Sequence, residues 1–469
     1  MTSRAGAWAH AVARVAVVGG VGAALVVGAQ DLGTISSGLP PATGEQAGSS
    51  TTTAYCPGAP FAPGAGSVVG IAAPAVALEG LAEASGVPGA VTVDPLPAGP
   101  STDDGRQDRA RDSVSLPDRP VRVRGSQDRA PGVVAGQSFT AEGEERSGLA
   151  TLTCTPPEAE SWLIAGEDED GSRGRVVLVN PSSSAATAEV SALGGRSTRV
   201  RVPAEARTEV PLDRLRGAGP AHVVHVQAEG GPVSASLAVE RQGELPAGVA
   251  TVGPTTAPAT RQVVPGNADA VGKSLVLAAP GERDAKVEIT AAATKSSDVT
   301  KEVTVPAGEQ REVDLPEVEG MHTWLVDSDE PVLAAGRLTT ATPDGRGDRA
   351  WTVATPPVTG LAGASLPTEA PKHVSRYLEV AAPDGPARVE ILVLTDGRVG
   401  TRTLRIDRHR SKALDVGRAE AVWVRPRDGR VHAAVLLLGD EKAKDPAIAS
   451  MPLLHAPVSR SESEVVRSE

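Results

Sequence analysis

The sequence has 469 residues, which is enough for three or four domains of ordinary size. It contains 51 Gly and 39 Pro but five Trp, two Tyr and two Phe, so it is rich in turn formers and poor in large rings. This composition favours an all-β fold with many turns and aliphatic cores. With 46 Lys and Arg against 58 Asp and Glu, the net charge of −12 argues against a nucleic-acid or anionic-lipid binder, whose affinity depends on neutralising phosphate.

Residues 1–30 have the pattern of a targeting segment. Basic residues precede an uncharged, mostly apolar run over residues 15–29, as in a signal peptide. Val27 and Ala29 would supply the small side chains that signal peptidase needs before its cleavage point. Counted from Ala11, the run is instead long enough for one transmembrane helix. Both alternatives, a cleaved signal and a single membrane anchor, place the body of the protein outside the cytoplasm.

Cysteine usage agrees with an exported protein. The chain has two cysteines, Cys56 and Cys154, and the simplest prediction is one disulfide between them. Such a bridge closes a loop of about a hundred residues, for which chain entropy gives a stabilisation of about 4 to 5 kcal/mol. A redox or metal pair is the alternative, but it lacks CxxC spacing and neighbouring ligands. No cofactor is expected.

An internal repeat is the main organising signal of the sequence. A short strand that ends at a proline occurs four times, at Pro74, Pro181, Pro280 and Pro383. Pairs of alternating apolar residues follow it across a polar turn, and a second predicted hairpin comes next, for example over residues 323–338. These signals predict four repeats of about a hundred residues. Their predicted boundaries are residues 54–157, 158–255, 256–357 and 358–455.

Each repeat contains six or seven short predicted strands and no convincing helix, which indicates an immunoglobulin-like β-sandwich. A β-propeller is the competing repeat architecture, but a hundred residues is about twice the length of an ordinary blade. We therefore expect tandem sandwiches in an open row rather than a closed ring. Trp324 and Trp423 fall at matching places in repeats 3 and 4, where a core ring is favoured over an aromatic ligand platform.

Three segments are expected to be flexible. Residues 31–53 read as a polar linker above the membrane, and residues 456–469 read as a disordered tail. Repeat 1 carries a polar insertion over residues 94–113, where the other repeats have a seven-residue turn. Its Pro, Gly and Asp content favours disorder over a binding loop.

Two short motifs suggest ligands that their context argues against. Residues 267–274, NADAVGKS, nearly match a phosphate-binding loop, but a true one opens a helix and here a repeat strand follows. His222 and His225 have HxxH spacing, yet residues three apart on a strand point to opposite faces and cannot share a metal. We expect neither a nucleotide nor a metal at these places.

Two further motifs are weak for the same reason. The acidic run at residues 167–171 lacks the spaced ligands of a calcium loop and reads as a solvated turn. Arg346, Gly347 and Asp348 form an RGD tripeptide, but turns favour Gly and Asp for backbone reasons alone. The sequence also contains no GxSxG or HExxH motif.

A resemblance to a known family appears in the order of several motifs. CPG at Cys56, the later Cys154, SWLIAG from Ser161 and LVNPS from Leu178 together resemble the actinobacterial exported proteins grouped as domain of unknown function 5719. The resemblance covers about residues 50–455. The family has no established activity, so the resemblance implies an envelope location and supplies no catalytic residue.

Two functional hypotheses remain. We favour a non-catalytic, exported cell-envelope protein that scaffolds or binds an unknown envelope glycan or protein partner, and we do not expect it to be an enzyme. The alternative is an envelope glycan or peptide hydrolase that uses acidic residues of the repeat 1 insertion. Those residues are Asp103, Asp104, Asp108 and Asp112.

Overall fold

The computed structural model places the described residues in one compact unit. It describes residues 51–61, 64–82, 85–97, 109–141, 148–165, 172–217, 223–241, 248–268, 272–294, 299–341, 347–367, 373–440 and 446–458. The predicted signal or anchor, residues 1–30, lies outside them. Within the described ranges, no helix is long and apolar enough to cross a membrane. The described residues are mainly β-strand, as predicted, and the three short helices are α2 (Ala75–Leu78), η1 (Gln127–Arg129) and η2 (Leu212–Arg214).

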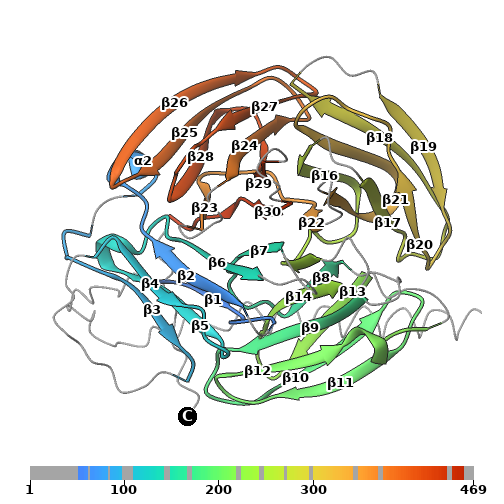
Figure 1. Ribbon diagram of the computed structural model, residues 1–469, viewed down its shortest axis with the longest axis horizontal. Helices are drawn as coiled ribbons and strands as arrows, with labels where there is room; N and C mark the ends of the chain where they lie inside the picture. Colours follow the sequence, from blue (N-terminus) through green and yellow to red (C-terminus); the bar gives the residue numbers. More distant parts are fainter. Residues whose placement is uncertain are drawn as a thin grey trace, which may run out of the picture. The chain divides into compact units, whose positions relative to one another are not determined.

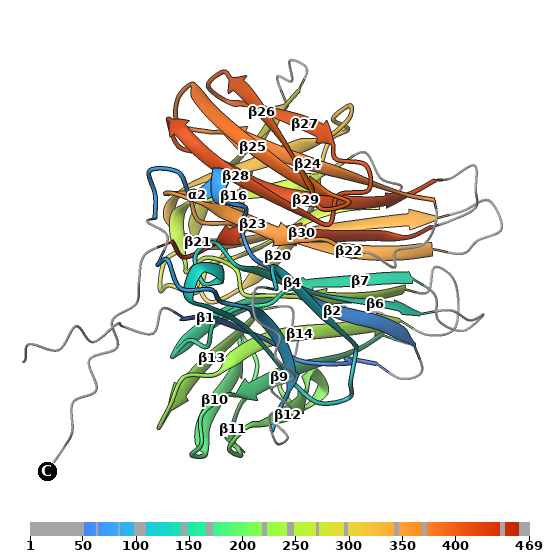
Figure 2. The same ribbon diagram turned by 90° about the vertical axis from the view of Figure 1, so that its left-hand side faces the viewer.

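The strands group into antiparallel sheets that face each other in pairs (Figures 1 and 2). In repeat 1 the first sheet contains, in spatial order, β1 (Thr51–Cys56), β5 (Val121–Ser126) and β3 (Val91–Pro95), and the second contains β4 (Arg111–Ser115), β2 (Ala65–Ile71), β6 (Val134–Ala141) and β7 (Gly148–Thr153). In repeat 2 the first contains β11 (Ser197–Val202), β10 (Ala186–Ala192), β13 (Val223–Glu229) and β8 (Glu160–Ile164), and the second contains β12 (Ala206–Pro211), β9 (Ser172–Asn180), β14 (Ser234–Arg241) and β15 (Gly248–Val252).

Repeats 3 and 4 follow the same plan. Repeat 3 pairs β19 (Thr300–Val305), β18 (Ala285–Ala293), β21 (His322–Ala341) and β16 (Ala259–Asn267) on one side, and β20 (Gln310–Asp314), β17 (Gly272–Ala278), β21 again and β22 (Gly347–Val353) on the other. In repeat 4 the first sheet contains, in spatial order, β26 (Arg398–Ile406), β25 (Ala387–Thr395), β28 (Ala421–Asp428), β23 (Ala362–Ser365) and β31 (Leu454–His455). The second sheet contains β27 (Arg410–Asp415), β24 (Val374–Ala382), β29 (His432–Gly439) and β30 (Ile448–Pro452).

The sandwich cores are thin and aliphatic, as the composition predicts. Along β10 every second residue is buried, and these residues are Ala186, Ala188, Val190 and Ala192. This alternation places one face of the strand in the core and the other toward the outside.

The two halves of the predicted second hairpin do not pair with each other, so that prediction is wrong. In repeat 3 its two halves belong to one continuous strand, β21, which pairs with β18 near its start and with β17 near its end. Residues 327–331, which read as a turn, are where the strand passes from one sheet to the other. In repeat 2 the same passage separates β13 from β14 at Gly230 and Gly231, both with positive φ. The two halves therefore stabilise opposite sheets instead of each other.

The four repeats close into a ring, which corrects the expected open row. The last strands contact one another in a circle, β7 with β15, β15 with β22, β22 with β30, and β30 with β7. Figure 1 shows β7, β22 and β30 near the centre, with the four groups of strands around them. Repeat length excluded a ring of single four-stranded blades, but it does not exclude a ring of two-sheet repeats. An edge strand leaves N–H and C=O groups unpaired, and closure lets four such edges meet.

A buried carboxylate fills the place where the four edges meet. Asp348, on β22, is fully buried and accepts backbone N–H groups from the other three repeats. Its Oδ2 lies 2.8 Å from Leu149 N and 3.0 Å from Ile448 N, and its Oδ1 lies 3.4 Å from Val249 N. The backbone N–H of Arg349, in the equivalent position of repeat 3, also binds it. Burial raises the pKa of Asp348 well above its usual range, and the four N–H groups oppose that shift.

Side chains next to these amides join each repeat to its neighbour. Leu149 of repeat 1 packs in the core cluster of repeat 4, and Ile448 of repeat 4 packs beside Leu338 of repeat 3. Hydroxyl groups also link neighbouring edges, because Thr251 Oγ1 donates to Thr151 O and Thr153 Oγ1 donates to Pro452 O, both at 3.0 Å. The ring is therefore held by apolar contacts and by satisfied backbone groups.

Gly148 makes room for the central carboxylate. A Cβ at this position would lie 2.1 Å from Asp348 Oδ1, and the residue has φ +137°. We expect Gly148→Ala to lower the free energy of unfolding by about 2 to 4 kcal/mol through overpacking and backbone strain. Urea denaturation measures the loss. Gly281→Ala, where a Cβ meets nothing within 4 Å, is the control and should be near neutral.

Several predicted segment ends differ in the structure. β1 begins at Thr51, inside the predicted linker, because three threonines with high strand propensity pair with β5. The predicted insertion, residues 94–113, contributes its ends to β3 and β4, and residues 98–108 lie outside the described part of the chain. Ala456, in the predicted tail, is buried, and its N–H donates to Leu361 O at 2.8 Å.

Candidate functional site

The first sheets of repeats 2, 3 and 4 differ in how far the next repeat covers their outer faces. The residues His225, Leu325 and Trp423 occupy the same register in these sheets, opposite Trp162, Val263 and Gly363. Leu325 is 2% exposed, and Trp423 is fully buried with its indole N–H donating to Gly132 O of repeat 1 at 3.0 Å. The His225 side chain keeps 19% of its surface exposed. The outer face of repeat 2 is therefore the least covered of the three.

An aromatic pair stands on this less covered face. The rings of Trp162 and His225 are stacked, with centroids 3.9 Å apart and planes 9° from parallel. Glu160 Oε1 lies 2.7 Å from His225 Nε2 and holds the ring in that orientation. Strand geometry explains the grouping, because Glu160 and Trp162 are two residues apart on β8 and Trp162 is directly opposite His225 on β13.

Polar side chains surround the pair. Ser191 lies opposite His225 on β10, and Gln227, opposite Glu160, is exposed. Trp162 is partly buried against the cluster that joins the core of repeat 2 to Trp351 of repeat 3. A partly buried indole stacked on an imidazole, beside a carboxylate and an amide, combines apolar ring surface with hydrogen-bonding groups. This combination suits a sugar ring, and we call Glu160, Trp162, His225 and Gln227 the aromatic face.

Trp324 and Trp423, for which the sequence favours a core position over a ligand platform, do not belong to the aromatic face. Trp324 lies in the core of repeat 3 and Trp423 at the contact of repeat 4 with repeat 1, so both are buried, as the core interpretation expects. They are one register position apart, not at matching places, and a shift of one residue reverses the face. The signal for the aromatic face was available as His225, a polar residue aligned with Leu325 and Trp423.

The other predicted site residues are not brought together. His222 and residues 167–171 lie outside the described residues, as do Asp103, Asp104 and Asp108. Asp112 Oδ2 instead accepts the backbone N–H of Val93 at 2.9 Å, a structural role. In the part of the chain that is described, no three His, Cys, Asp or Glu side chains are placed to hold a metal ion.

The described residues of the phosphate-loop and RGD motifs lie in or next to strands, most of them buried. Asn267 ends β16, where it is buried and its Oδ1 accepts the hydroxyl of Thr352 at 2.9 Å, and β17 begins at Gly272. The near-match therefore joins two strands and opens no helix. Of the RGD residues, Gly347 and Asp348 are buried in β22, and Arg346 lies outside the described residues.

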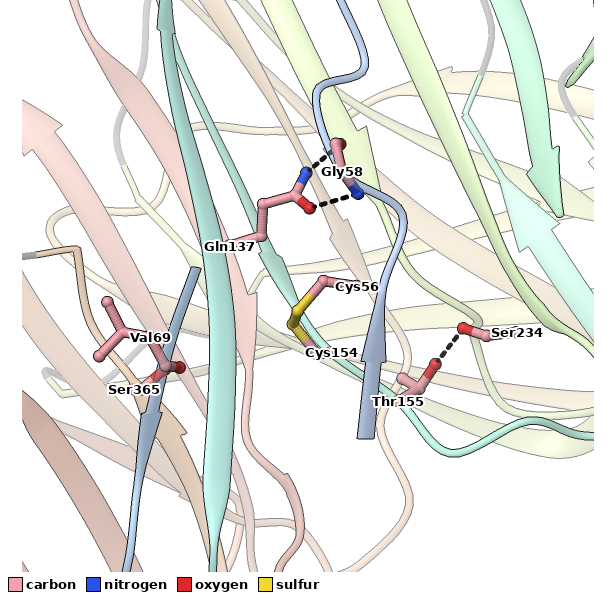
Figure 3. The surroundings of a disulfide bond; sticks show 8 residues. All are labelled: Cys56, Gly58, Val69, Gln137, Cys154, Thr155, Ser234 and Ser365. Atoms are coloured by element: carbon pink, nitrogen blue, oxygen red, sulfur yellow. Dashed lines mark hydrogen bonds between the residues drawn. A yellow bond between two sulfur atoms is a disulfide. The ribbon is translucent and has the colours of Figure 1, made fainter. Parts of the chain in front are cut away.

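Cys56 and Cys154 form the predicted disulfide (Figure 3). It joins β1 to the residue that follows β7, and both cysteines lie in the core of repeat 1. Gln137 holds the chain just beyond it, accepting Gly58 N–H at 3.0 Å and donating to Gly58 O at 2.9 Å. The hydroxyls of Thr155 and Ser234, 3.0 Å apart, link this region to repeat 2.

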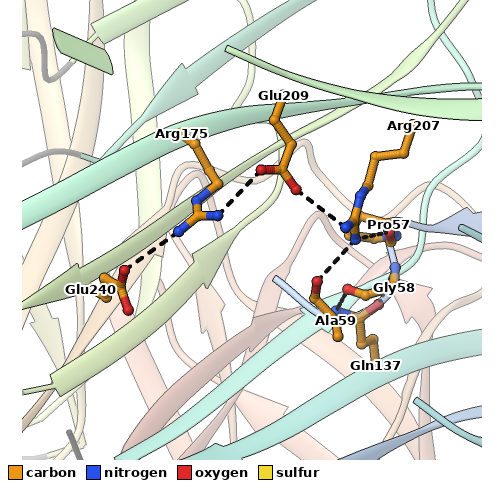
Figure 4. Close-up of polar contacts among 8 residues, drawn as sticks. All are labelled: Pro57, Gly58, Ala59, Gln137, Arg175, Arg207, Glu209 and Glu240. Atoms are coloured by element: carbon orange, nitrogen blue, oxygen red, sulfur yellow. Dashed lines mark hydrogen bonds and ion pairs between the residues drawn. The ribbon is translucent and has the colours of Figure 1, made fainter. Parts of the chain in front are cut away.

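A charged network fixes the segment that follows Cys56 to repeat 2 (Figure 4). Arg207 donates to the carbonyls of Pro57 and Ala59 at 3.0 and 2.9 Å. Glu209 pairs with both Arg207 and Arg175, which lie 3.3 and 3.2 Å from its oxygens. The network is structural, because its donors are used on backbone carbonyls and neighbouring carboxylates.

Two buried titratable groups lie where repeats 3 and 4 meet. Glu379 accepts the backbone N–H of Gly266 at 2.7 Å, and burial raises its pKa to about 7. His432 donates from Nδ1 to Thr355 O at 2.8 Å, and burial lowers its pKa to about 4. Both shifts favour the neutral form in the folded state.

These shifts have opposite effects on the pH dependence of stability. Between pH 4.5 and 7 folded Glu379 keeps a proton that the unfolded chain releases, so its contribution to stability falls as pH rises. Between pH 4 and 6.5 the unfolded chain protonates at His432 and the folded chain does not, so that contribution is lost as pH falls.

Glu379→Gln should separate the two effects. Glutamine matches the protonated carboxyl in shape, so the variant should be close to wild type at pH 4.5. By pH 8 it should gain up to about 3 kcal/mol relative to wild type, because it has no proton to lose. Denaturation at both pH values measures the difference, and His432, present in both proteins, cancels. A stability difference that is the same at both pH values, or the same trend in the exposed control Glu309→Gln, would contradict the assignment.

The sequence matches the model of a family of unknown function, DUF5719, over residues 105–417. The chain belongs to this family. The match runs from the insertion of repeat 1 into repeat 4 and so spans most of the ring. No curated protein matches the sequence.

Proposed function

We propose that this DUF5719 chain is a non-catalytic, extracytoplasmic scaffold that binds an envelope glycan at the aromatic face of repeat 2. The observation that carries the proposal is the Trp162 and His225 stack, held by Glu160 on an outer face that is less covered than those of repeats 3 and 4. The disulfide supports the location, since such bonds persist in oxidising compartments. A closed ring supports a scaffold role, because four interlocked repeats hold that face rigidly.

The finer predictions belong to the same proposal. An immunoglobulin-like class for each sandwich is supported by two facing antiparallel sheets in about a hundred residues. An N-terminal signal or single anchor is supported by the charged and apolar pattern of residues 1–30. Either would place the aromatic face where envelope glycan is found.

Co-sedimentation with insoluble envelope glycan tests the binding role. Wild-type protein should sediment with the glycan, and Trp162→Ala should weaken binding about tenfold or more, the usual cost of losing an aromatic contact. Trp162→Phe, which keeps a ring, should retain part of the affinity. The matched control is Glu229→Gln, an exposed change at the far end of β13 that should bind like wild type.

The same samples distinguish binding from hydrolysis. Release of soluble sugars or peptides during incubation would contradict the non-catalytic proposal and favour the alternative of a hydrolase. Equal binding by wild type and Trp162→Ala would show that the aromatic face is not the site. Thermal unfolding of each variant shows whether the sandwich of repeat 2 remains intact.

A further inference from the structure

The outer hairpins of repeats 2, 3 and 4 provide an internal comparison of surface charge. In repeat 2, Glu189 of β10 lies directly opposite Arg199 of β11, and their side chains form an ion pair at 3.3 Å. Repeat 3 places Glu302 where repeat 2 has Arg199, so Glu288 faces a second carboxylate. Like charges directly opposite each other destabilise a sheet. Repeat 3 therefore has a local charge conflict that repeat 2 avoids.

The conflict in repeat 3 extends across three strands. On its other side Glu288 lies opposite Asp327 of β21, so three carboxylates form a row on one exposed face. Asp327 is paired with Arg261 at 3.5 Å, whereas Glu288 and Glu302 have no ion pair with any described residue. The row lies in an open groove whose charged lining also includes Asp329, Lys286 and Arg311, of which Arg311 donates to Thr304 O at 3.0 Å. We call Glu288 and Glu302 the acidic pair.

Repeat 4 carries the opposite conflict on the same face of its hairpin. Glu390, in the position of Glu288, is neutralised by Arg427 at 2.5 Å. Two residues away, Arg388 of β25 lies directly opposite Arg405 of β26. Both arginines are exposed, and neither forms an ion pair within the described ranges, although Arg388 lies opposite Asp428 of β28 on its other side. We call Arg388 and Arg405 the basic pair.

The basic pair stands beside a free sheet edge. β26 pairs with β25 alone, and its first six residues are all exposed, including Arg398 and Arg402. A long exposed edge strand can pair with the edge strand of another molecule. The arginines on β26 disfavour pairing of this edge with the same edge of a second copy, because their like charges repel. The acidic groove of repeat 3 has the complementary sign and lies beside β19, another edge strand.

We propose that the acidic pair of one copy binds the basic pair of a second copy, so that the protein associates head to tail. One chain carries both surfaces, each with two like charges directly opposite each other and of opposite sign to the other surface, and contact relieves both conflicts at once. Because two different patches meet, the contact is heterologous. A head-to-tail dimer therefore keeps a free acidic pair on one copy and a free basic pair on the other, and further copies can add at both ends. This assembly is independent of glycan binding and would place aromatic faces in a repeating array.

Sedimentation velocity of the full-length protein tests the association. At low salt the wild type should form species larger than a monomer in a concentration-dependent way, and roughly 0.5 M salt should dissociate them. Two variants reverse one patch each, namely Glu288→Lys with Glu302→Lys, and Arg388→Glu with Arg405→Glu. Each should weaken self-association at least tenfold. The matched control, Glu189→Lys with Arg199→Glu, inverts the satisfied pair of repeat 2 and should associate like wild type.

Mixing the two reversed variants gives the sharpest result. Together they retain one unchanged acidic pair and one unchanged basic pair, and their two reversed patches are also complementary in charge. An equimolar mixture should therefore recover the self-association that each variant alone has lost. A wild type that stays monomeric at low salt would overturn the proposal, as would reversed variants that associate unchanged. Binding of an arginine-rich peptide by a monomeric wild type would instead assign the groove to a different cationic partner.

Discussion

Asp348→Asn is expected to lower the free energy of unfolding by about 3 to 5 kcal/mol. The two side-chain oxygens of Asp348 accept the N–H groups of Leu149, Val249 and Ile448, and each oxygen can accept a hydrogen bond whether or not the carboxyl is protonated. Asparagine keeps the shape but turns one acceptor into an NH₂ group, which then faces backbone donors. Buried donors without acceptors pay their full desolvation cost, and no water is expected to replace the lost oxygen in so tight a site.

Chemical denaturation of wild type and variant measures this loss, and Asp428→Asn is the matched control on an exposed strand end. Because Asp348 bonds all three other repeats, hydrogen exchange should rise together at Leu149, Val249 and Ile448. A loss below about 1 kcal/mol, the value of one ordinary hydrogen bond, would show that the central carboxylate does not hold the ring.

The position of Asp348 shows what the repeat pattern could not predict. Repeats 1, 2 and 4 have Gly148, Gly248 and Ala447 at the equivalent place, so the aspartate looks like a deviation in an exposed RGD turn. Its role depends on amides about a hundred and two hundred residues away, and those distances appear only when the ring closes. The local sequence pattern predicts where strands form. Closure of the ring depends on contacts between repeats that are far apart in the sequence, and the local pattern does not show these.

The hairpins illustrate the same limit. Alternating apolar residues correctly predict strands at β11 and β12, since Val202 and Val210 are both buried. Yet β11 pairs with β10 and β12 pairs with β9, because the short turn between them crosses from one sheet to the other. Periodicity of two assigns a face to each residue but does not name the neighbouring strand.

The aromatic face could be predicted only in part. The sequence shows Trp162 within the family motif and His225 within a predicted strand, but it separates them by more than sixty residues. What makes them notable is that the outer face of repeat 2 is less covered than those of repeats 3 and 4. The difference is visible at the register position that these repeats share. Leu325 and Trp423 are apolar and buried there, whereas His225 is polar and partly exposed.

Removing the disulfide should cost at least as much stability as changing Asp348. Cys56→Ser with Cys154→Ser is expected to lower the free energy of unfolding by about 4 to 5 kcal/mol, because the bond closes a loop between residues 98 apart in sequence. The first sheet of repeat 1 has three strands where the other repeats have four or five, and β1 is its edge. The bond ties this edge to the end of β7, which lies at the centre of the ring.

Denaturation of the double variant, and of wild type with and without reductant, measures the effect. Reduced wild type should match the variant, and reductant should leave the variant unchanged. Gln137→Ala serves as a comparison, because it removes the two hydrogen bonds to Gly58 but keeps the covalent link, and it should cost less than the double variant. If the double variant were as stable as wild type, Gln137 and the Arg207 contacts would be sufficient to hold β1, and the disulfide would mark the compartment without stabilising the ring.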